Sequence, residues 1–196
     1  MNDLSKRILD FWFGNVDETG RDTRWFQSTP EFDAHIRDAF GQALTAVGNG
    51  AFQRWSAHAR SWLAYILLTD QFPRNVHRGE ARAFQFDGLA LDMAKRGIAR
   101  GLDRQLGIIE RSFAYMPLEH SESLHDQQTC VALFRQLVES ASEPDTANAQ
   151  SSLDYAEQHR EIIARFGRFP HRNDVLGRAH TREELAYLKT ANRFGQ

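Results

Sequence analysis

Residues 155–173 read Tyr-Ala-Glu-Gln-His-Arg-Glu-Ile-Ile-Ala-Arg-Phe-Gly-Arg-Phe-Pro-His-Arg-Asn. In the first half of this segment, Tyr155, His159, Ile162 and Phe166 recur at a spacing that places them on one face of an amphipathic helix. The second half is rich in arginine and histidine and contains a proline, which cannot continue a helix. We therefore predict a helix that stops before the proline and carries a polar tail.

Two earlier segments have the same order, a helical pattern followed by a proline and then by polar residues. Residues 70–75 read Asp-Gln-Phe-Pro-Arg-Asn, and residues 115–120 read Tyr-Met-Pro-Leu-Glu-His. The residue before a proline is disfavoured in the helical conformation. We therefore expect one helix to end near Phe72 and another near Met116, which makes three predicted helix ends of one kind.

The spacing of hydrophobic residues is helical along the rest of the chain as well. A chain of 196 residues is most simply a single domain, here residues 1–196, and we predict an all-α fold of antiparallel helical hairpins. About eight helices are expected, over approximately 4–13, 30–47, 56–72, 80–100, 103–116, a stretch beginning near 121–123, 155–166, and a last one after 181.

Side chains that can cap a helix mark several of these starts. Thr29 or Ser28 precedes the second helix, and Asp103 could cap the fifth. Ser123 and Thr181 each begin a capping-box pattern, in which an acidic residue follows three positions later.

The three proline-stopped helices are predicted to be the third, fifth and seventh. In an up-and-down array with short connections, alternate helices end on the same side of the molecule, so the three ends should meet. The aperiodic segment 140–152, which we interpret as a mobile loop, is long enough to let the seventh helix run the other way. Helices that begin on this side direct unpaired N–H groups toward it, and such groups favour anions.

The predicted meeting point gathers polar side chains from all three ends. Asp70, Gln127 and His159 occupy inward positions of otherwise apolar faces, where a polar group needs a hydrogen-bond partner. Arginine and histidine at a helix C-terminus can also serve only to bind the last carbonyl groups, so each residue has a structural alternative. The candidate ligand-binding residues are Asp70, Gln71, Arg74, Asn75, Arg111, Tyr115, Glu119, His120, Asp126, Gln127, His159, Arg168, His171, Arg172 and Asn173.

Charge and composition limit the classes of partner. The formal net charge of −2 gives no basic field, so we expect no nucleic-acid partner. The longest apolar run, residues 62–68, is far shorter than the roughly 20 residues that span a bilayer, and no signal-peptide pattern is present, so we expect no membrane partner. A single cysteine, Cys130, excludes an internal disulfide and fits a cytoplasmic location.

Nearly all basic residues are arginine rather than lysine. Arginine suits bidentate recognition of carboxylate or phosphate, although genomic base composition would give the same bias.

Glu122 and His125 match one Glu-x-x-His pair of a di-iron bundle, but that site needs a second pair, which the sequence lacks, so we expect no metal. No nucleophile elbow, P-loop or dinucleotide-binding glycine pattern occurs, and we expect no cofactor.

Several blocks of the sequence together resemble one known family. They are Ile-Leu-Asp-Phe-Trp-Phe-Gly at 8–14, the segment 70–75, Arg-Gly at 78–79, Ala-Arg-Ala-Phe at 81–84, Pro-Leu-Glu-His-Ser-Glu at 117–122, Asp-Gln at 126–127, His-Arg at 159–160, and Phe-Gly-Arg-Phe-Pro-His-Arg-Asn at 166–173. This set, which covers nearly the whole chain, resembles the bacterial family labelled domain of unknown function nine-two-four. The resemblance implies a right-handed, tetratricopeptide-like superhelix of helices, and it implies no activity.

Our leading hypothesis from the sequence is a cytoplasmic helical-repeat-like protein that binds an anionic ligand in an Arg/His-rich groove. The ligand would be an acidic peptide or a carboxylated or phosphorylated metabolite. The residues assigned to these roles are Arg74, Arg168 and Arg172 for the anion, and Asp70, Glu119 and His159 for its positioning. The alternative is a metal-independent hydrolase or transferase with His120 or His171 as the acid–base group. A third possibility is a scaffold whose polar network only fixes the fold.

Overall fold

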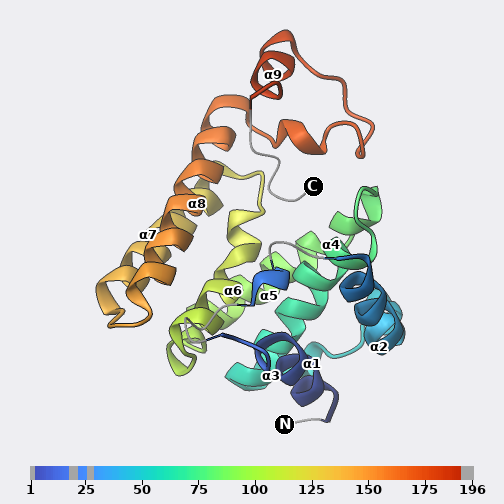
Figure 1. Ribbon diagram of the computed structural model, residues 1–196, viewed down its shortest axis with the longest axis vertical. Coiled ribbons are helices and arrows are strands. Elements are labelled where there is room, and N and C mark those ends of the chain that lie inside the picture. The colour runs from blue at the N-terminus through green and yellow to red at the C-terminus, as the bar shows by residue number, and fades with distance from the viewer. Residues whose placement is uncertain (1–2, 18–21, 26–28, 191–196) are drawn as a thin grey trace.

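The computed structural model describes residues 3–17, 22–25 and 29–190, and within these ranges the chain is helical with no β-strand (Figure 1). The α-helices are α1 (Asp3–Phe13), α2 (Pro30–Gly48), α3 (Ala59–Ile66), α4 (Phe72–Val76), α5 (Asp87–Ala99), α6 (Ile108–Glu119), α7 (Leu124–Ser140), α8 (Thr146–Phe166) and α9 (Arg182–Tyr187). A π-helical segment, Leu67–Gln71, joins α3 and α4 into one continuous helix. The described residues therefore form about eight helical rods, as predicted.

The helices pack in succession around one main apolar core. Helix α3 packs against α1, α5 and α6, and α6, α7 and α8 pack against one another. Figure 1 shows α7 and α8 as a long pair along one side of the molecule, with the segment that carries α9 at one end. The all-α fold is thereby confirmed, and a right-handed tetratricopeptide-like superhelix remains a prediction compatible with this arrangement. No described helix has the length and apolar character needed to cross a membrane.

Large aromatic side chains fill the core because the apolar faces of α1, α3 and α6 meet there. Trp12 packs edge-on against Phe113 at a centroid distance of 5.6 Å and lies at the same distance from Phe72. Trp62 is fully buried and donates from Nε1 to the carbonyl oxygen of Met93 at 2.8 Å. Its ring lies over Gly97 of α5, where an added Cβ would stand only 2.1 Å from a ring atom. The two helices approach this closely because position 97 has no side chain.

The predicted helix stop before Pro73 is wrong. The helix continues through the π-helical segment to Val76, and the N–H of Phe72 donates to the carbonyl of Leu67, five residues back. A π turn already interrupts the regular i→i−4 ladder, and Pro73 follows at once. The N–H that proline lacks is therefore missing where the ladder is already irregular, so the helix is not broken.

The predicted stop at Met116 is wrong as well. Helix α6 contains Pro117 and continues to Glu119, and the N–H of His120 still donates to the carbonyl of Met116 at 2.9 Å. The predicted start near Asp103 is also corrected, because α6 begins at Ile108 and Asp103 lies in a separate 3-10 turn. The helix predicted over 80–100 is divided into a 3-10 turn, Ala81–Phe84, and α5.

Three of the predicted caps are confirmed. Thr29, Ser123 and Thr181 each accept a hydrogen bond from the backbone N–H three residues later. Ser28, the alternative cap of α2, lies outside the described residues. Cap side chains act on their immediate neighbours in sequence, which is why the pattern alone identified them.

The loop predicted over 140–152 is too long, because α8 begins at Thr146. Asn148 and Ala149 are buried in that first part of the helix, a contact that the aperiodic sequence did not indicate. Tyr155, predicted to face inward, is 44% exposed. Helix α8 ends at Phe166 because Gly167 adopts a left-handed conformation with φ of 68°, so a glycine rather than Pro170 stops this helix.

Candidate functional site

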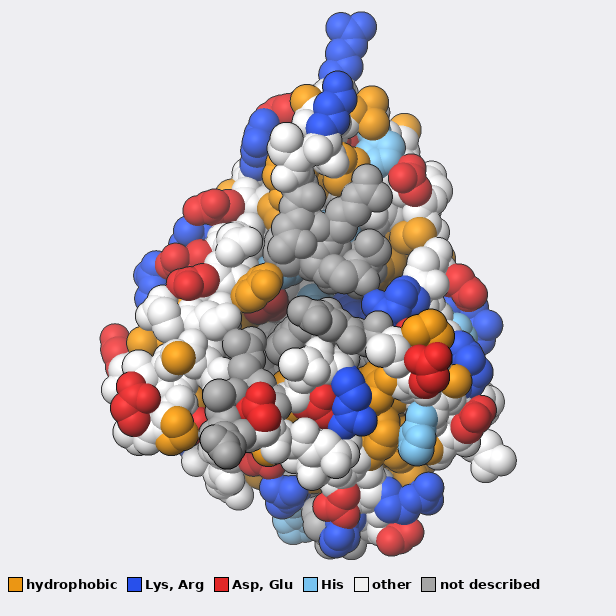
Figure 2. Space-filling view, viewed as in Figure 1, with side chains coloured by type: hydrophobic (Ala, Val, Ile, Leu, Met, Phe, Trp, Pro, Cys, Tyr) orange, Lys and Arg blue, Asp and Glu red, His pale blue; other side chains and the backbone are white. Residues whose placement is uncertain are grey.

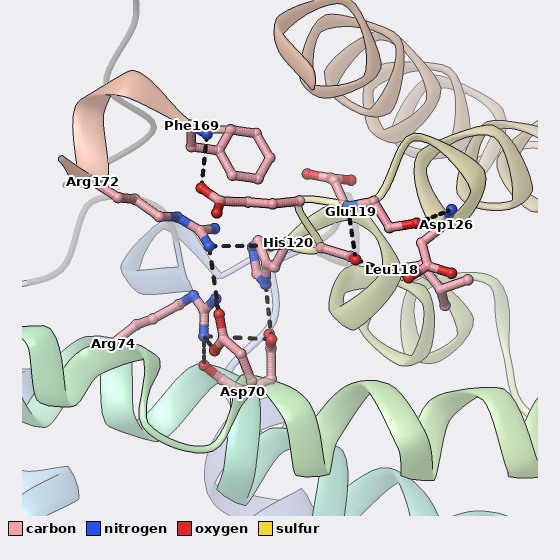
Figure 3. Close-up of polar contacts among 12 residues, drawn as sticks. Asp70, Arg74, Leu118, Glu119, His120, Asp126, Phe169 and Arg172 are labelled. Atoms are coloured by element: carbon pink, nitrogen blue, oxygen red, sulfur yellow. Dashed lines mark hydrogen bonds and ion pairs between the residues drawn. The ribbon is translucent and has the colours of Figure 1, made fainter. Parts of the chain in front are cut away.

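Asp70 lies at the centre of the polar contacts between α4, α6 and the segment that follows α8 (Figure 3). It belongs to the π-helical segment, and its side chain is almost completely buried. One carboxylate oxygen, Oδ1, bonds to Nδ1 of His120 at 2.8 Å, and the other accepts a hydrogen bond from Gln71. The π-helical segment supplies the carboxylate and the C-terminal end of α6 supplies the imidazole, although the two residues are fifty positions apart in sequence.

Arg74 lies one turn after Asp70 and is held by carboxylate and carbonyl oxygens. Its two terminal nitrogens bind the two carboxylate oxygens of Asp87 at 2.9 and 3.0 Å, and one of them donates to the carbonyl of Asp70 at 2.7 Å. The closest approach of this guanidinium to the Asp70 carboxylate is 3.4 Å. Arg74 therefore joins α4 to the start of α5 and places a positive charge beside Asp70.

Arg172 comes from the 3-10 turn Pro170–Arg172 and is buried. It donates to the carbonyl of His120 at 3.1 Å, and its guanidinium lies between two aromatic rings, 4.7 Å from the centroid of Phe84 and 4.4 Å from that of Phe169. Its Nε atom is buried without a hydrogen-bond partner among the described residues. Burial and the charge of Arg74 lower the pKa of Arg172 to about 10, so the group remains charged at neutral pH.

The electrostatics favour an ionised Asp70 beside a neutral His120. Burial alone would raise the pKa of Asp70, but the charge of Arg74 and the bond to His120 hold that pKa below its ordinary value. Burial and the charge of Arg74 lower the pKa of His120. A neutral imidazole that donates from Nδ1 to a carboxylate carries its lone pair on Nε2. In the part of the chain that the structure describes, Nε2 of His120 has no hydrogen-bond partner.

Glu119 and His159 form a second buried pair next to His120. Nδ1 of His159 lies 3.4 Å from Oε1 of Glu119 and bonds to the carbonyl of Tyr155 at 2.9 Å. Burial, together with the charge of Asp70, raises the pKa of Glu119 to about 8, and burial lowers that of His159 to about 3. The two groups lie within ion-pair distance, and the directions of both pKa displacements favour their neutral forms.

Two acidic residues that the sequence analysis did not include in the site hold it together. Asp87 binds Arg74, as described above, and lies 3.5 Å from Arg172. Glu122 accepts from the backbone N–H of Phe169 at 2.8 Å and pairs with Arg178 at 2.7 Å. These contacts join residues up to 85 positions apart, so no local pattern could have shown them. We term Asp70, Arg74, Asp87, Glu119, His120, His159 and Arg172 the polar junction.

Several predicted site residues lie outside the polar junction and have structural partners. Tyr115 donates to Asp103 at 2.7 Å and accepts from Arg111, earlier in α6 than Glu119. Asp126 pairs with Lys95 at 2.6 Å. The remaining contacts are those of Gln127 with the carbonyls of Glu119 and Ser121, Arg168 with Glu184 and the carbonyl of Ala179, Asn75 with Asp33, and Asn173 with Arg178 and His180.

Two further candidates lie at the edge of the polar junction. Gln71 contacts the sulfur of Met116 in addition to Asp70. His171 lies 5.4 Å from Phe169 between ring centroids, and burial together with the charge of Arg172 lowers its pKa to about 3. Among the described residues, no three His, Cys, Asp or Glu side chains are grouped so as to hold a metal ion.

Figure 2 shows a depression between the segment that carries α9 and the rest of the molecule, in which acidic, basic and histidine side chains are visible. The side chain of His120 is 16% exposed, whereas that of Asp70 beneath it is 1% exposed. The junction therefore combines a buried carboxylate with an imidazole that solvent can reach.

Comparisons with known proteins agree with this fold. The family model described as "Bacterial protein of unknown function (DUF924)" matches residues 8–192. A solved structure of a protein of unknown function from Agrobacterium tumefaciens is 37% identical, covers 96% of this chain and 98% of that chain, and superposes with a TM-score of 0.83. No curated protein matches the chain. Neither similarity supplies an activity.

Proposed function

The chain belongs to the DUF924 family of bacterial proteins, whose function is unknown, and from its polar junction we propose that it is a hydrolase or transferase in which His120 acts as a general base. The observation that carries this proposal is the bond between Nδ1 of His120 and the buried carboxylate of Asp70. A carboxylate in this position fixes the tautomer and orientation of an imidazole and leaves Nε2 to accept a proton.

The proton would come from a water molecule or from a hydroxyl group of a substrate. The lowered pKa of His120 keeps its base form dominant at neutral pH. Asp70 stabilises the imidazolium that forms when the proton is accepted, because its carboxylate stays ionised under the influence of Arg74. Arg172 donates to the backbone carbonyl of His120 and is charged, so it could stabilise negative charge that develops on a substrate.

The proposal is tested with a panel of chromogenic carboxylic esters, amides and phosphoesters. His120→Gln and Asp70→Asn should each reduce turnover by about 10²–10⁴-fold, the usual contribution of general acid–base catalysis. His125→Gln is the matched control, because His125 is exposed on α7 and should leave turnover unchanged. For the unsubstituted protein, turnover should fall as the pH drops through the lowered pKa of His120.

Absence of turnover of every compound by the unsubstituted protein would refute the enzyme proposal. Equal turnover by His120→Gln would remove His120 from the mechanism. An acid limb of the pH profile that begins above the ordinary histidine pKa of about 6.5 would contradict the assignment of a buried, neutral imidazole as the base.

We propose binding of an anionic ligand without catalysis as the second candidate function. Arg172 favours it, because this charged guanidinium has a buried Nε without a hydrogen-bond partner among the described residues. Arg74 and Arg168, the other two arginines assigned to the anion, are already bound to Asp87 and Glu184. Of the three arginines expected from the sequence, Arg168 is committed to Glu184, whereas Arg74 and Arg172 share Asp87 and each keep a buried Nε without a partner among the described residues.

A thermal-shift screen of acidic peptides and of carboxylated and phosphorylated metabolites tests this second function. A ligand at a hundred times its dissociation constant should stabilise the protein by about 2.7 kcal/mol. The shift should be lost in Arg172→Ala and kept in Arg165→Ala, which removes an arginine from an exposed pair with Glu183. A screen in which no anion shifts the melting temperature would exclude the anion-binding function.

A further inference from the structure

Two buried side chains beside His120 have hydrogen-bonding capacity that the described residues do not use. Arg172 is 6% exposed and has an unpartnered Nε. Glu119 is 7% exposed, and its carboxyl oxygen Oε1 lies 3.4 Å from Nδ1 of His159. That Nδ1 gives its hydrogen to the carbonyl of Tyr155, so the carboxyl group receives no hydrogen from it. A buried polar group without a partner is costly, so each side chain favours a ligand that completes its bonding.

The two side chains belong to one continuous circuit of contacts. Glu119 precedes His120 in the chain, and Arg172 donates to the carbonyl of His120. His159 lies 3.4 Å from Glu119, and its ring centroid is 5.5 Å from that of Phe169, whose ring lies under Arg172. Glu119 and Arg172 are therefore connected through His120 and through the pair formed by His159 and Phe169, and a molecule bound at His120 is close to both.

The two side chains have opposite chemistry. Arg172 offers donors and a positive charge, which suit a carboxylate. The titratable groups that face Glu119 are Asp70 from the π-helical segment, Cys130 from α7 and His159 from α8, and none of them supplies a positive charge at neutral pH. A buried carboxyl group in such surroundings is complementary to a bound ammonium group, whose charge would replace the missing cation.

We propose that the substrate of this site is a small zwitterion of the amino-acid class, with its carboxylate bound by Arg172 and its protonated amine bound by Glu119. This inference rests on the proposed function, because it names the class of molecule that is presented to His120. A dipeptide, or an amino acid with an ester or amide in its side chain, keeps both charges and carries a group on which an activated water could act.

Binding of the amine has a measurable consequence for protons. The free protein holds Glu119 in its neutral form at pH 7, because its pKa is about 8. The ammonium group favours the carboxylate form, so the carboxyl proton is released to solvent when the zwitterion binds. A ligand that carries a carboxylate but no amine leaves Glu119 neutral and releases no proton.

Isothermal titration calorimetry in two buffers of different ionisation enthalpy measures this release. The probes are glycine, β-alanine, 4-aminobutanoate and 5-aminopentanoate, which differ in the distance between amine and carboxylate, with acetate and methylamine as ligands of one charge. At pH 7 the best-fitting member should bind about tenfold more tightly than either single-charge ligand, or better, and should release about one proton. If the unsubstituted protein binds the zwitterions with no higher affinity than acetate, the proposal is overturned, and no substituted protein is needed for this result.

Substitutions then assign the two ends of the ligand. Glu119→Gln should abolish proton release and reduce the affinity for the zwitterion to that for acetate, while Arg172→Gln should reduce it to that for methylamine. Glu161→Gln is the control, because Glu161 is an exposed carboxylate on α8 and should change neither quantity. Proton release that persists in Glu119→Gln would show that another group titrates and would overturn the assignment.

The same titrations separate this inference from the enzyme proposal. His120→Gln should keep zwitterion binding and proton release but lose turnover of dipeptides and of amino acids with side-chain esters or amides. If the unsubstituted protein binds the zwitterion and turns over none of these compounds, the enzyme proposal fails and the binding assignment stands. Turnover of esters that lack an amine, without preference for those that carry one, would overturn the substrate class and leave the role of His120 intact.

Discussion

The aromatic core around α1, α3 and α6 and the polar junction are both buried, but different interactions hold them. Trp12, Trp62 and Phe113 are each at most 1% exposed and contact mainly other apolar side chains. Asp70 and Arg172 are buried to a similar degree, yet they depend on ion pairs and on hydrogen bonds to backbone carbonyls. Equal burial therefore does not mean equal physical behaviour.

The comparison explains where function is to be sought. Burial of apolar area stabilises the core at any pH, because none of its atoms titrates. In the polar junction, burial moves the pKa of Glu119 up to about 8 and that of His159 down to about 3. Groups with displaced pKa values beside a hollow can exchange protons with a ligand, whereas the aromatic core can only support them.

The largest effect is expected in the core. Trp62→Ala should lower the free energy of unfolding by about 3–5 kcal/mol, because it leaves a cavity and removes the bond from Nε1 to the carbonyl of Met93. Urea unfolding measures the loss, which should be the same at pH 5.5 and pH 8.5. If the loss of unfolding free energy differed between the two pH values, the core would also contribute to pH-dependent stability, and the distinction between the core and the polar junction would fail.

The next effect is expected in the junction and should depend on pH. The raised pKa of Glu119 gives a contribution to stability that is complete below the unfolded-state value of about 4.5 and is lost as the pH rises through about 8. Relative to the unsubstituted protein, Glu119→Gln should therefore gain about 2–3 kcal/mol of stability between pH 4.5 and pH 8.5, roughly half of the limit set by the pKa displacement. Parallel stability–pH curves for the two proteins would show that Glu119 is not buried in its neutral form.

A smaller loss is expected where α3 and α5 cross. Gly97→Ala places a methyl group against the ring of Trp62, so the helices must separate or the ring must shift. Overpacking costs about 1–3 kcal/mol, and the better helix propensity of alanine offsets part of it, so we expect a net loss of about 1–2 kcal/mol. Gly88→Ala on the same helix meets no atom within 4 Å and is the matched control. A similar change in both variants would mean that helix propensity rather than packing decides the result.

The smallest effect is expected at α9, beyond the junction. Thr181→Ala removes the side chain that accepts from the N–H of Glu184, which should cost about 1 kcal/mol. Hydrogen exchange should become faster in Arg182–Tyr187, while exchange in α3 should not change. Faster exchange in α3 as well would show that α9 and the core unfold as one unit.

The sequence predicted which residues lie at the site better than it predicted which residues they contact. The inward positions of Asp70 and His159 follow from helical spacing, and the proximity of Asp70, His120 and Arg172 matches the expectation that alternate helix ends meet. Arg111 and Tyr115 were expected as partners for the inward polar groups, but Arg111 donates to the hydroxyl of Tyr115 and Tyr115 donates to Asp103. A residue's face on a helix is set locally, whereas its partner depends on which other segment arrives there.

The amino-acid sequence by itself determined the all-α fold, the apolar faces and the caps at Thr29, Ser123 and Thr181, because these depend on residues within one or two helical turns. Only the tertiary structure decided that the helices continue past Pro73 and Pro117. It also decided the protonation of the junction, because burial and charges from distant segments displace the pKa values of Glu119 and His120. Proline propensity is a local preference that packing can override, and a pKa is a property of the assembled surroundings.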